Sequence, residues 1–226
     1  MAVSSIESLV ERGVQGVLFD NDGTLVDSRD LLLASFRFAT EQVLGRTFSD
    51  TEFMAGVGTP LDLQMYDFTD DPALAVELAR VYREHNAAVH DDLIRSFPGM
   101  TEVLERFRAA GIALGVVTSK RHEVAARGLR RCGLDGFFEV LIGPDDWPEH
   151  KPAPGPVLHA CDLMGLDPHA CAYVGDSPFD IRAGNAAGTA SVAVLWGMFP
   201  HDELVREGPA AVCERIDALP GLFGVR

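Results

Sequence analysis

The sequence contains no long hydrophobic run. Its most apolar stretch, residues 190–199, reaches about half the ~20 residues that a membrane helix needs, and Ser191 and Gly197 interrupt it. The N-terminal segment carries Glu7 and Glu11, whereas a signal peptide has a basic start followed by an apolar core. These absences predict a cytoplasmic protein that does not act on membranes.

Basic residues are also scarce. The chain has 19 Lys and Arg residues against 34 Asp and Glu residues, which gives a formal net charge of −15. Nucleic acids bind to clusters of cationic side chains, so this composition argues against a nucleic-acid partner. A small anionic substrate is still compatible with it, because a metal ion or a few well-placed cations can reverse the local field.

Cysteine and histidine patterns are missing too. The cysteines form no CxxC pair and no tight disulfide framework, so we expect reduced thiols that are mostly packed in the interior. They are Cys132, Cys161, Cys171 and Cys213. The seven histidines show no spacing typical of zinc ligands, and we predict no zinc site.

What the sequence does contain is an alternation of short apolar runs and helical periods. The 226 residues, 47% of them hydrophobic, suggest one folded domain, or one domain with an insert. Strand-length runs lie at residues 16–19, 112–117, 138–142, 170–174 and 191–196, and helical segments at 101–110, 122–131, 154–164 and 178–187. Strands that alternate with helices predict right-handed βαβ units and a parallel sheet covered on both faces.

One region interrupts this alternation. Leu32, Phe36, Ala39 and Val43 follow a helical period that Gly45 ends, and a second helix is expected to begin at residues 71–72. After the first strand-length run, no second strand candidate appears before residue 112. The fold class we predict is therefore α/β, a Rossmann-like doubly wound parallel sheet with an inserted all-helical domain. The core would comprise residues 1–26 and 98–226, and the insert residues 27–97.

The first apolar run ends in two carboxylates, Asp20 and Asp22, followed by Gly23. Acids at positions i and i+2 point the same way, and each disfavours ionisation of the other unless a cation compensates. A simple Asp-Gly hairpin turn is the alternative, but it predicts an antiparallel strand directly afterwards, and the next segment is helical.

The second apolar run ends in Thr118 and Ser119. Their hydroxyl groups could bind an anion together with the free N–H groups of the following helix, or they could simply cap that helix. Lys151 lies between His150 and Pro152, where restricted backbone would aim its side chain, although a solvated surface lysine is the alternative.

The fourth apolar run is followed by Asp176, Ser177, Pro178 and Asp180. Ser177 fits the cap of a helix that has Pro178 in its first turn, and Asp180 then fits a capping box. This structural interpretation explains Asp180 but does not explain Asp176, which lies outside the helix.

In an open α/β sheet, ligands bind at the carboxyl ends of the strands, where the strand order reverses. If the first strand is central and is flanked by the second and fourth, then Asp20, Asp22, Thr118 and Asp176 converge, and Lys151 can reach them. So many carboxylates require a cation, and Mg²⁺ prefers such oxygen ligands. Carboxylates, a metal, a lysine and a hydroxyl suit a phosphoryl group, which one carboxylate attacks.

These residues resemble the haloacid dehalogenase superfamily, specifically its phosphatases with an aspartate nucleophile. Four motifs occur in the family's order. They are residues 19–25 (DxDGT), residues 116–118, residues 151–152 and residues 175–180 (GDxxxD). The resemblance implies a magnesium-dependent phosphohydrolase whose helical insert is a cap over the substrate. The acid at position 22 favours a phosphatase, because dehalogenating relatives lack it.

The resemblance also implies the role of each residue. Asp20 would be the nucleophile that becomes aspartyl-phosphate, and Asp22 the general acid and base. The implied phosphate-binding residues are Thr118, Ser119, Lys151, Asn21 and Gly23. The implied Mg²⁺ ligands are Asp20, Asp22 through its backbone carbonyl, and Asp176, with Ser177 and Asp180 in support. Asn21 departs from the apolar residue usual at its position.

Within the family, the nearest likeness is to phosphoglycolate phosphatases and to pyrophosphatases of the PpaX type. The expected substrate is a small phosphorylated metabolite, or pyrophosphate, bound by a monomer or homodimer. Candidate cap contacts are Arg83, His85 and Asn86, with His90 nearby; a solvated helix face is the alternative for all of them. A sugar phosphomutase shares the motifs, whereas a phospho-receiver module or a non-catalytic phosphate-binding protein would belong to a different functional class.

Overall fold

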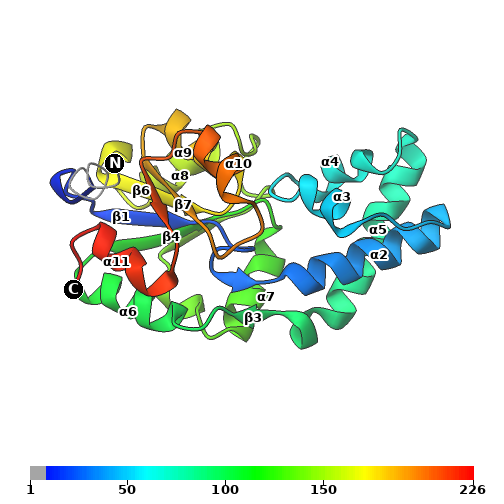
Figure 1. The fold of residues 1–226 in the computed structure, drawn as a ribbon, viewed down its shortest axis with the longest axis horizontal. Coiled ribbons are helices and arrows are strands. Elements are labelled where there is room, and N and C mark those ends of the chain that lie inside the picture. Colours follow the sequence, from blue (N-terminus) through cyan, green and yellow to red (C-terminus); the bar gives the residue numbers. More distant parts are fainter. Residues whose placement is uncertain (1–8) are drawn as a thin grey trace.

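The computed structural model describes residues 9–226, which form an α/β body and a helical body (Figure 1). The α/β body contains a six-stranded sheet in the order β5-β4-β1-β6-β7-β8. Its strands are β1 (Gly16–Phe19), β4 (Ala113–Val117), β5 (Val140–Ile142), β6 (Cys171–Gly175), β7 (Ala190–Val194) and β8 (Ala211–Cys213). All of its pairings are parallel. The predicted parallel sheet is confirmed, with the first strand between the second and fourth of the predicted runs.

Helices cover both faces of this sheet (Figure 1). Val17 and Phe19 of β1 pack with residues of α6, α7 and α11, whereas Leu18 packs with residues of α8 and α9. This division follows from the strand period, because successive side chains point to opposite faces. The helices are α6 (Met100–Ala109), α7 (His122–Arg131), α8 (Gly155–Leu163), α9 (Pro178–Ala187), α10 (His201–Arg206) and α11 (Leu219–Leu222), with short 3-10 turns η2 (Asp135–Phe137), η3 (Pro168–Ala170) and η4 (Ile216–Ala218).

The edge strand β8 was not predicted from the sequence. It has only three residues, which pair with β7, and the residues on either side carry no strand period. A run this short is below the length at which alternation can be recognised.

The helical body consists of two long antiparallel helices and several short ones. Its elements are α2 (Arg29–Leu44), α3 (Asp50–Ala55), α4 (Leu61–Gln64), η1 (Met65–Asp67) and α5 (Pro72–Leu93). The two predicted helices are present with their expected signals. Gly45 ends α2 at a φ of 65°, and the Asp71 side chain accepts a hydrogen bond from Ala73 N–H at the start of α5. The body has its own apolar cluster around Phe36.

Two short strands connect the two bodies. β2 (Val26–Asp27) and β3 (Arg95–Ser96) pair in antiparallel fashion, so the chain leaves and re-enters the α/β body at one place. The segment between them, residues 28–94, contains the helices of the helical body, and we propose residues 27–97 as the limits of the helical domain. Among the described residues, no helix is both long and apolar enough to cross a membrane.

Candidate active site

The carboxyl end of the central strand carries the first pair of acids. Asp20 directly follows β1, and its backbone N–H donates to Val174 O of β6 at 2.9 Å. Thr118 follows β4, which pairs with the other side of β1, and Asp176 follows β6. The strand order thus brings these three side chains to one edge of the sheet, the convergence that the sequence predicts.

Lys151 lies at the centre of this edge. Its Nζ donates to Asp20 Oδ1 at 2.9 Å and to Asp180 Oδ1 at 2.6 Å, and all three side chains are almost fully buried. Burial, opposed by Lys151, raises the pKa of Asp20 to about 7, and the nearby Asp180 and Asp22 add to the rise. The two carboxylates keep the pKa of Lys151 well above its usual range despite its burial. The solvated-lysine alternative is therefore wrong.

Asp180 serves two purposes at once. It forms the predicted capping box at the start of α9, because its Oδ2 accepts from Ser177 N–H and the Ser177 hydroxyl accepts from Asp180 N–H. Its other oxygen contacts Lys151, and the Tyr173 hydroxyl donates to that same oxygen at 3.1 Å. The cap fixes the carboxylate so that it can also hold Lys151 in place.

Three buried acids offer a candidate cation site. Asp20, Asp176 and Asp180 each present a carboxylate oxygen, and these oxygens lie within 4.8 Å of one another. Burial raises the pKa of Asp176 well above its usual range, and the nearby Asp180 and Asp20 raise it further. Several acids that disfavour one another's ionisation, with oxygen ligands only, fit a hard divalent cation such as Mg²⁺.

Two neighbours position the Asp176 carboxylate. Its Oδ1 accepts from the Thr24 hydroxyl at 3.0 Å, and its Oδ2 accepts from Met198 N–H at 2.7 Å. Gly23 has a φ of 81°, and a Cβ at this position would overlap the same carboxylate. Glycine is therefore required here for conformation and for space, and Gly23 lies at the site without offering it a side chain.

The Asp22 carboxylate is not part of the acidic group. It accepts a hydrogen bond of 2.6 Å from Lys120 Nζ, and this ammonium lowers the pKa of Asp22 against the opposing effect of burial. The two side chains are only 13% and 11% exposed. The carboxylate of Asp22 is thus engaged with Lys120, and its backbone carbonyl is the atom left to act as a magnesium ligand. The resemblance implies this same carbonyl.

The two hydroxyl residues after β4 have different surroundings. The Thr118 hydroxyl accepts from Lys120 N–H at 3.1 Å beside the acids, whereas the Ser119 hydroxyl donates to Gly58 O of the helical body at 2.6 Å. Neither caps α7, whose first N–H, that of His122, donates instead to Asp145. Ser119 therefore joins the two bodies in this structure.

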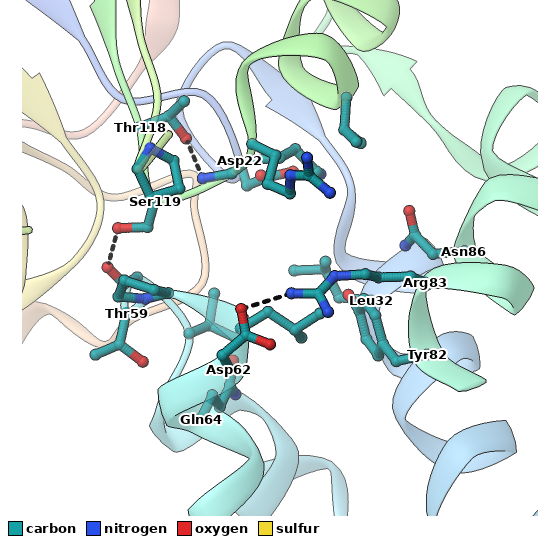
Figure 2. Close-up of a pocket in the computed structure, with 18 of the residues that line it drawn as sticks. Asp22, Leu32, Thr59, Asp62, Gln64, Tyr82, Arg83, Asn86, Thr118 and Ser119 are labelled. Carbon is teal, nitrogen blue, oxygen red and sulfur yellow. Dashed lines mark hydrogen bonds and ion pairs between the residues drawn. The ribbon is translucent and has the colours of Figure 1, made fainter. Parts of the chain in front are cut away.

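A cavity of about 780 Å³ lies above the acids and between the two bodies. Its core side includes Asp20, Asp22, Thr118 and Asp176, and α5 contributes Arg83, Asn86 and His90 from the opposite side. Figure 2 shows Asp22 and Thr118 on one side of this space and Arg83 and Asn86 on the other. The Asn21 side chain is fully buried and does not line the cavity, so its backbone N–H remains the candidate donor.

His85 is not among the residues that line the cavity. Its Nδ1 lies 3.3 Å from the Ser35 hydroxyl, and its ring stacks on Phe38 of α2 at a centroid distance of 4.4 Å. On a helix, the residue two positions after Arg83 points to a different face. This placement removes His85 from the candidate substrate contacts.

Lys120 is the site residue that sequence reasoning did not assign. The tripeptide Thr118-Ser119-Lys120 stands at the end of a predicted strand, so its position near the sheet edge was available from the sequence. The ion pair with Asp22 could not be predicted from the sequence. It joins residues 98 positions apart and depends on side-chain conformations that the sequence pattern does not specify.

The comparisons with known proteins agree with this geometry. Residues 17–194 match the model of the haloacid dehalogenase-like hydrolase family. A putative pyrophosphatase PpaX of Caldanaerobacter subterraneus is 39% identical over 196 residues, covering 87% of this chain and 88% of the relative. The pyrophosphatase PpaX of Bacillus pumilus is 32% identical over 216 residues, covering 95% and 98%.

Solved structures show the same fold. The crystal structure of a predicted phosphoglycolate phosphatase from Haemophilus somnus superposes with a TM-score of 0.85 at 27% identity, covering 92% of this chain and 96% of the other. The family match spans the sheet from β1 to β7, the helical body and all four motifs. This chain therefore belongs to the haloacid dehalogenase-like hydrolases, the enzyme family that its motifs predict.

Proposed function

We propose that this hydrolase is a magnesium-dependent phosphatase that transfers a phosphoryl group from a small substrate to Asp20 and then to water. The observation that carries the proposal is the contact of the buried Lys151 ammonium with Asp20, a member of the acidic group that itself lines the cavity. A nucleophilic carboxylate, a fixed cation and a candidate metal site at one place are what phosphoryl transfer requires.

In the first step, one Asp20 oxygen attacks phosphorus and the bond from phosphorus to the leaving oxygen breaks. Asp22, which is ionised in the free protein, takes up a proton from solvent when the substrate binds and gives it to that oxygen as general acid. Asp22 lines the same cavity two residues further along the chain, so it can reach the far side of the bound phosphoryl group. The products of this step are aspartyl-phosphate at Asp20 and the free leaving group.

In the second step, Asp22 removes a proton from water, and the resulting oxygen attacks the phosphorus of aspartyl-phosphate. The bond between phosphorus and the Asp20 oxygen breaks, which regenerates the carboxylate and releases phosphate. The net reaction is hydrolysis of one phosphate ester or anhydride bond. The Lys120 ammonium keeps Asp22 ionised in the free protein, and this is the form that accepts a proton from water.

Thr118 and Lys151 would hold the oxygens of the phosphoryl group, since both lie beside Asp20 at the carboxyl edge of the sheet. Asp20 and Asp176, with Asp180 next to them, would hold the cation. When bound, Mg²⁺ supplies positive charge that offsets the repulsion between nucleophile and substrate. Two unit charges of like sign 4 Å apart repel by about 4 kcal/mol at an effective dielectric constant of 20.

The test is phosphate release with Mg²⁺ from a panel that contains phosphoglycolate, pyrophosphate, sugar phosphates and nucleotides, ranked by kcat/KM. We expect turnover in the wild type, none in Asp20→Asn, and a short-lived phosphoenzyme after acid quenching. Turnover by a folded Asp20→Asn protein would refute the assignment of the nucleophile. Return of the phosphoryl group to a sugar phosphate would indicate a phosphomutase, and a long-lived phosphoenzyme a receiver.

Pyrophosphate is the second candidate substrate, and it is favoured by the curated relatives. Several relatives at 30% identity or more over nearly the whole chain carry the name pyrophosphatase PpaX, whereas the name phosphoglycolate phosphatase comes from structures of lower identity. In the panel, a kcat/KM for pyrophosphate that exceeds the value for phosphoglycolate would assign the chain to this group.

A further inference from the structure

The cavity extends beyond the acids, and the lining of this upper part combines apolar residues, positively charged side chains and the acids Asp62, Glu123 and Asp145. Lys120 reaches it from the loop after β4, and Arg83 reaches it from α5 of the helical body. The phosphoryl group would occupy the floor beside Asp20, so the rest of the substrate must lie in this upper part. The charges there therefore bear on the leaving group rather than on the phosphoryl group.

Lys120 is held in place but has free capacity to bind. Its Nζ is 2.6 Å from Asp22 Oδ1, and no other side-chain partner of this atom occurs among residues 9–226. An ammonium group has three N–H donors, so two remain after the contact with Asp22. Lys120 can therefore donate to Asp22 and to a substrate oxygen at the same time.

Arg83 faces the same space from the other body. Its Nη2 lies 2.6 Å from Asp62 Oδ2 of α4, and the two side chains are 38% and 69% exposed. Figure 2 shows this pair meeting beside the cavity, with Asn86 further along α5. Ion pairs this exposed are weak, because water screens them and both side chains lose conformational freedom. An anion in the cavity can therefore take over Arg83 from Asp62.

We propose that Lys120 and Arg83 bind the leaving group of the substrate, and that this leaving group carries a negative charge of its own. A phosphate or a carboxylate supplies the required anionic oxygens. The inference rests on the proposed phosphatase function and adds to it the class of substrate. Because Lys120 contacts Asp22, an oxygen bound to Lys120 lies beside the carboxyl group that handles the leaving-group proton.

Substrates with an uncharged leaving group are discriminated against at this site. They would bury the Lys120 ammonium without a partner for its remaining donors. The free-energy penalty for leaving a buried charged group without a hydrogen-bond partner exceeds the penalty for a neutral group. Sites built around such polar groups reject analogues that lack the matching partner. The upper cavity therefore selects pyrophosphate or an acidic phosphate ester over a neutral one.

The test compares kcat/KM for three substrates that share the phosphoryl group: pyrophosphate, phosphoglycolate, and 2-hydroxyethyl phosphate, which replaces the carboxylate of phosphoglycolate by a neutral hydroxymethyl group. In wild-type protein with Mg²⁺, we expect at least one anionic substrate to exceed the neutral one tenfold or more. The larger of the two values also tells whether the preferred leaving group is phosphate or an alkoxide that carries a carboxylate.

The variants are Lys120→Met, Lys120→Arg and Arg83→Gln, with Arg130→Gln as the control, an exposed cation of α7 that does not line the cavity. Lys120→Met should reduce the ratio of anionic to neutral substrate by tenfold or more, and Arg83→Gln should reduce it severalfold. Lys120→Arg and the control should keep it. The ratio is taken between phosphoglycolate and 2-hydroxyethyl phosphate. Both are alkyl esters whose leaving oxygen needs a proton, so a general effect on Asp22 alters both alike and cancels in this ratio.

Two results would overturn the inference while leaving the phosphatase proposal intact: a wild-type enzyme without preference for the anionic substrates, or equal losses on both kinds of substrate in Lys120→Met and Arg83→Gln. If Lys120→Met does not fold, the Arg83→Gln variant alone tests the inference. The Arg83 side chain is 38% exposed, so its replacement does not disturb the interior. Absence of phosphate release from every substrate in the wild type would instead contradict the proposed function itself.

Discussion

The Lys151 ammonium lies 2.9 Å from Asp20 Oδ1, and both side chains are less than 10% exposed. The contact spans 131 positions of the sequence and joins the end of β1 to the loop before α8. A buried cation that also contacts Asp180 counters the charge of two acids. It therefore links the stability of the free protein to the chemistry proposed for Asp20.

Replacement of Lys151 by methionine should affect both properties. Removing one partner from a buried ion pair leaves an uncompensated charge, which typically costs about 3–5 kcal/mol. We expect Lys151→Met to lower the free energy of unfolding by this amount in metal-free buffer at pH 8 and to abolish measurable turnover. Urea denaturation and phosphate release check the two effects. The exposed Arg130→Gln serves as the control, and an unchanged unfolding midpoint in Lys151→Met would contradict the argument.

Asp22→Asn should affect catalysis far more than folding. A positioned general acid and base contributes about 10²–10⁴ in rate, so we expect kcat to fall by that factor while the far-UV spectrum is retained. With a substrate whose leaving group needs no proton, the first step survives and phosphoenzyme at Asp20 accumulates. Acid quenching measures this accumulation. Asp30→Asn removes an exposed acid of α2 and should behave as wild type.

Much of this architecture could be predicted from the sequence, because it depends on local patterns. Runs of apolar residues indicate the strands, and a glycine or an N-cap residue marks helix ends such as Gly45 and Asp71. The clustering of Asp20, Thr118 and Asp176 then follows from one topological rule, that the carboxyl ends of parallel strands share an edge.

The remaining features depend on side-chain conformation and on contacts between distant segments. The sequence does not reveal that Lys120 pairs with Asp22, or that His85 turns toward Ser35 and away from the cavity. The short helix α3 is a different case. Its capping box, formed by Ser49 and Glu52, is a recognisable signal that sequence reasoning did not use.

The contact between the two bodies at Gly58 should be sensitive to a single methyl group. Gly58 has a φ of 103°, its carbonyl accepts from the Ser119 hydroxyl, and a Cβ there would lie 2.9 Å from the Phe179 ring. Gly58→Ala should therefore displace the loop that lines the cavity and lower kcat/KM roughly tenfold or more, since small misplacements are costly. Gly136→Ala adds a methyl group in open space and is the control. Equal kinetics of the two variants would contradict this account.

The stabilisation by Mg²⁺ should increase with pH. In the metal-free protein the pKa of Asp20 is raised from 3.8 to about 7, so the folded state binds this proton more tightly than the unfolded state. The corresponding stability is fully present below about pH 4 and is lost as the pH rises to about 7. Asp176, whose pKa is also raised, acts in the same direction.

A cation competes with these protons and is bound by the ionised carboxylates. The increase in Tm caused by Mg²⁺ should therefore be small at pH 5 and large at pH 8, and EDTA should remove both this increase and the turnover. Differential scanning fluorimetry at the two pH values measures the effect. Asp176→Asn, which removes one of the proposed ligands, should show little increase at either pH. An equal increase in the wild type at pH 5 and pH 8 would show that the cation binds elsewhere, because the raised pKa values of Asp20 and Asp176 make the charge of this site depend on pH over that range.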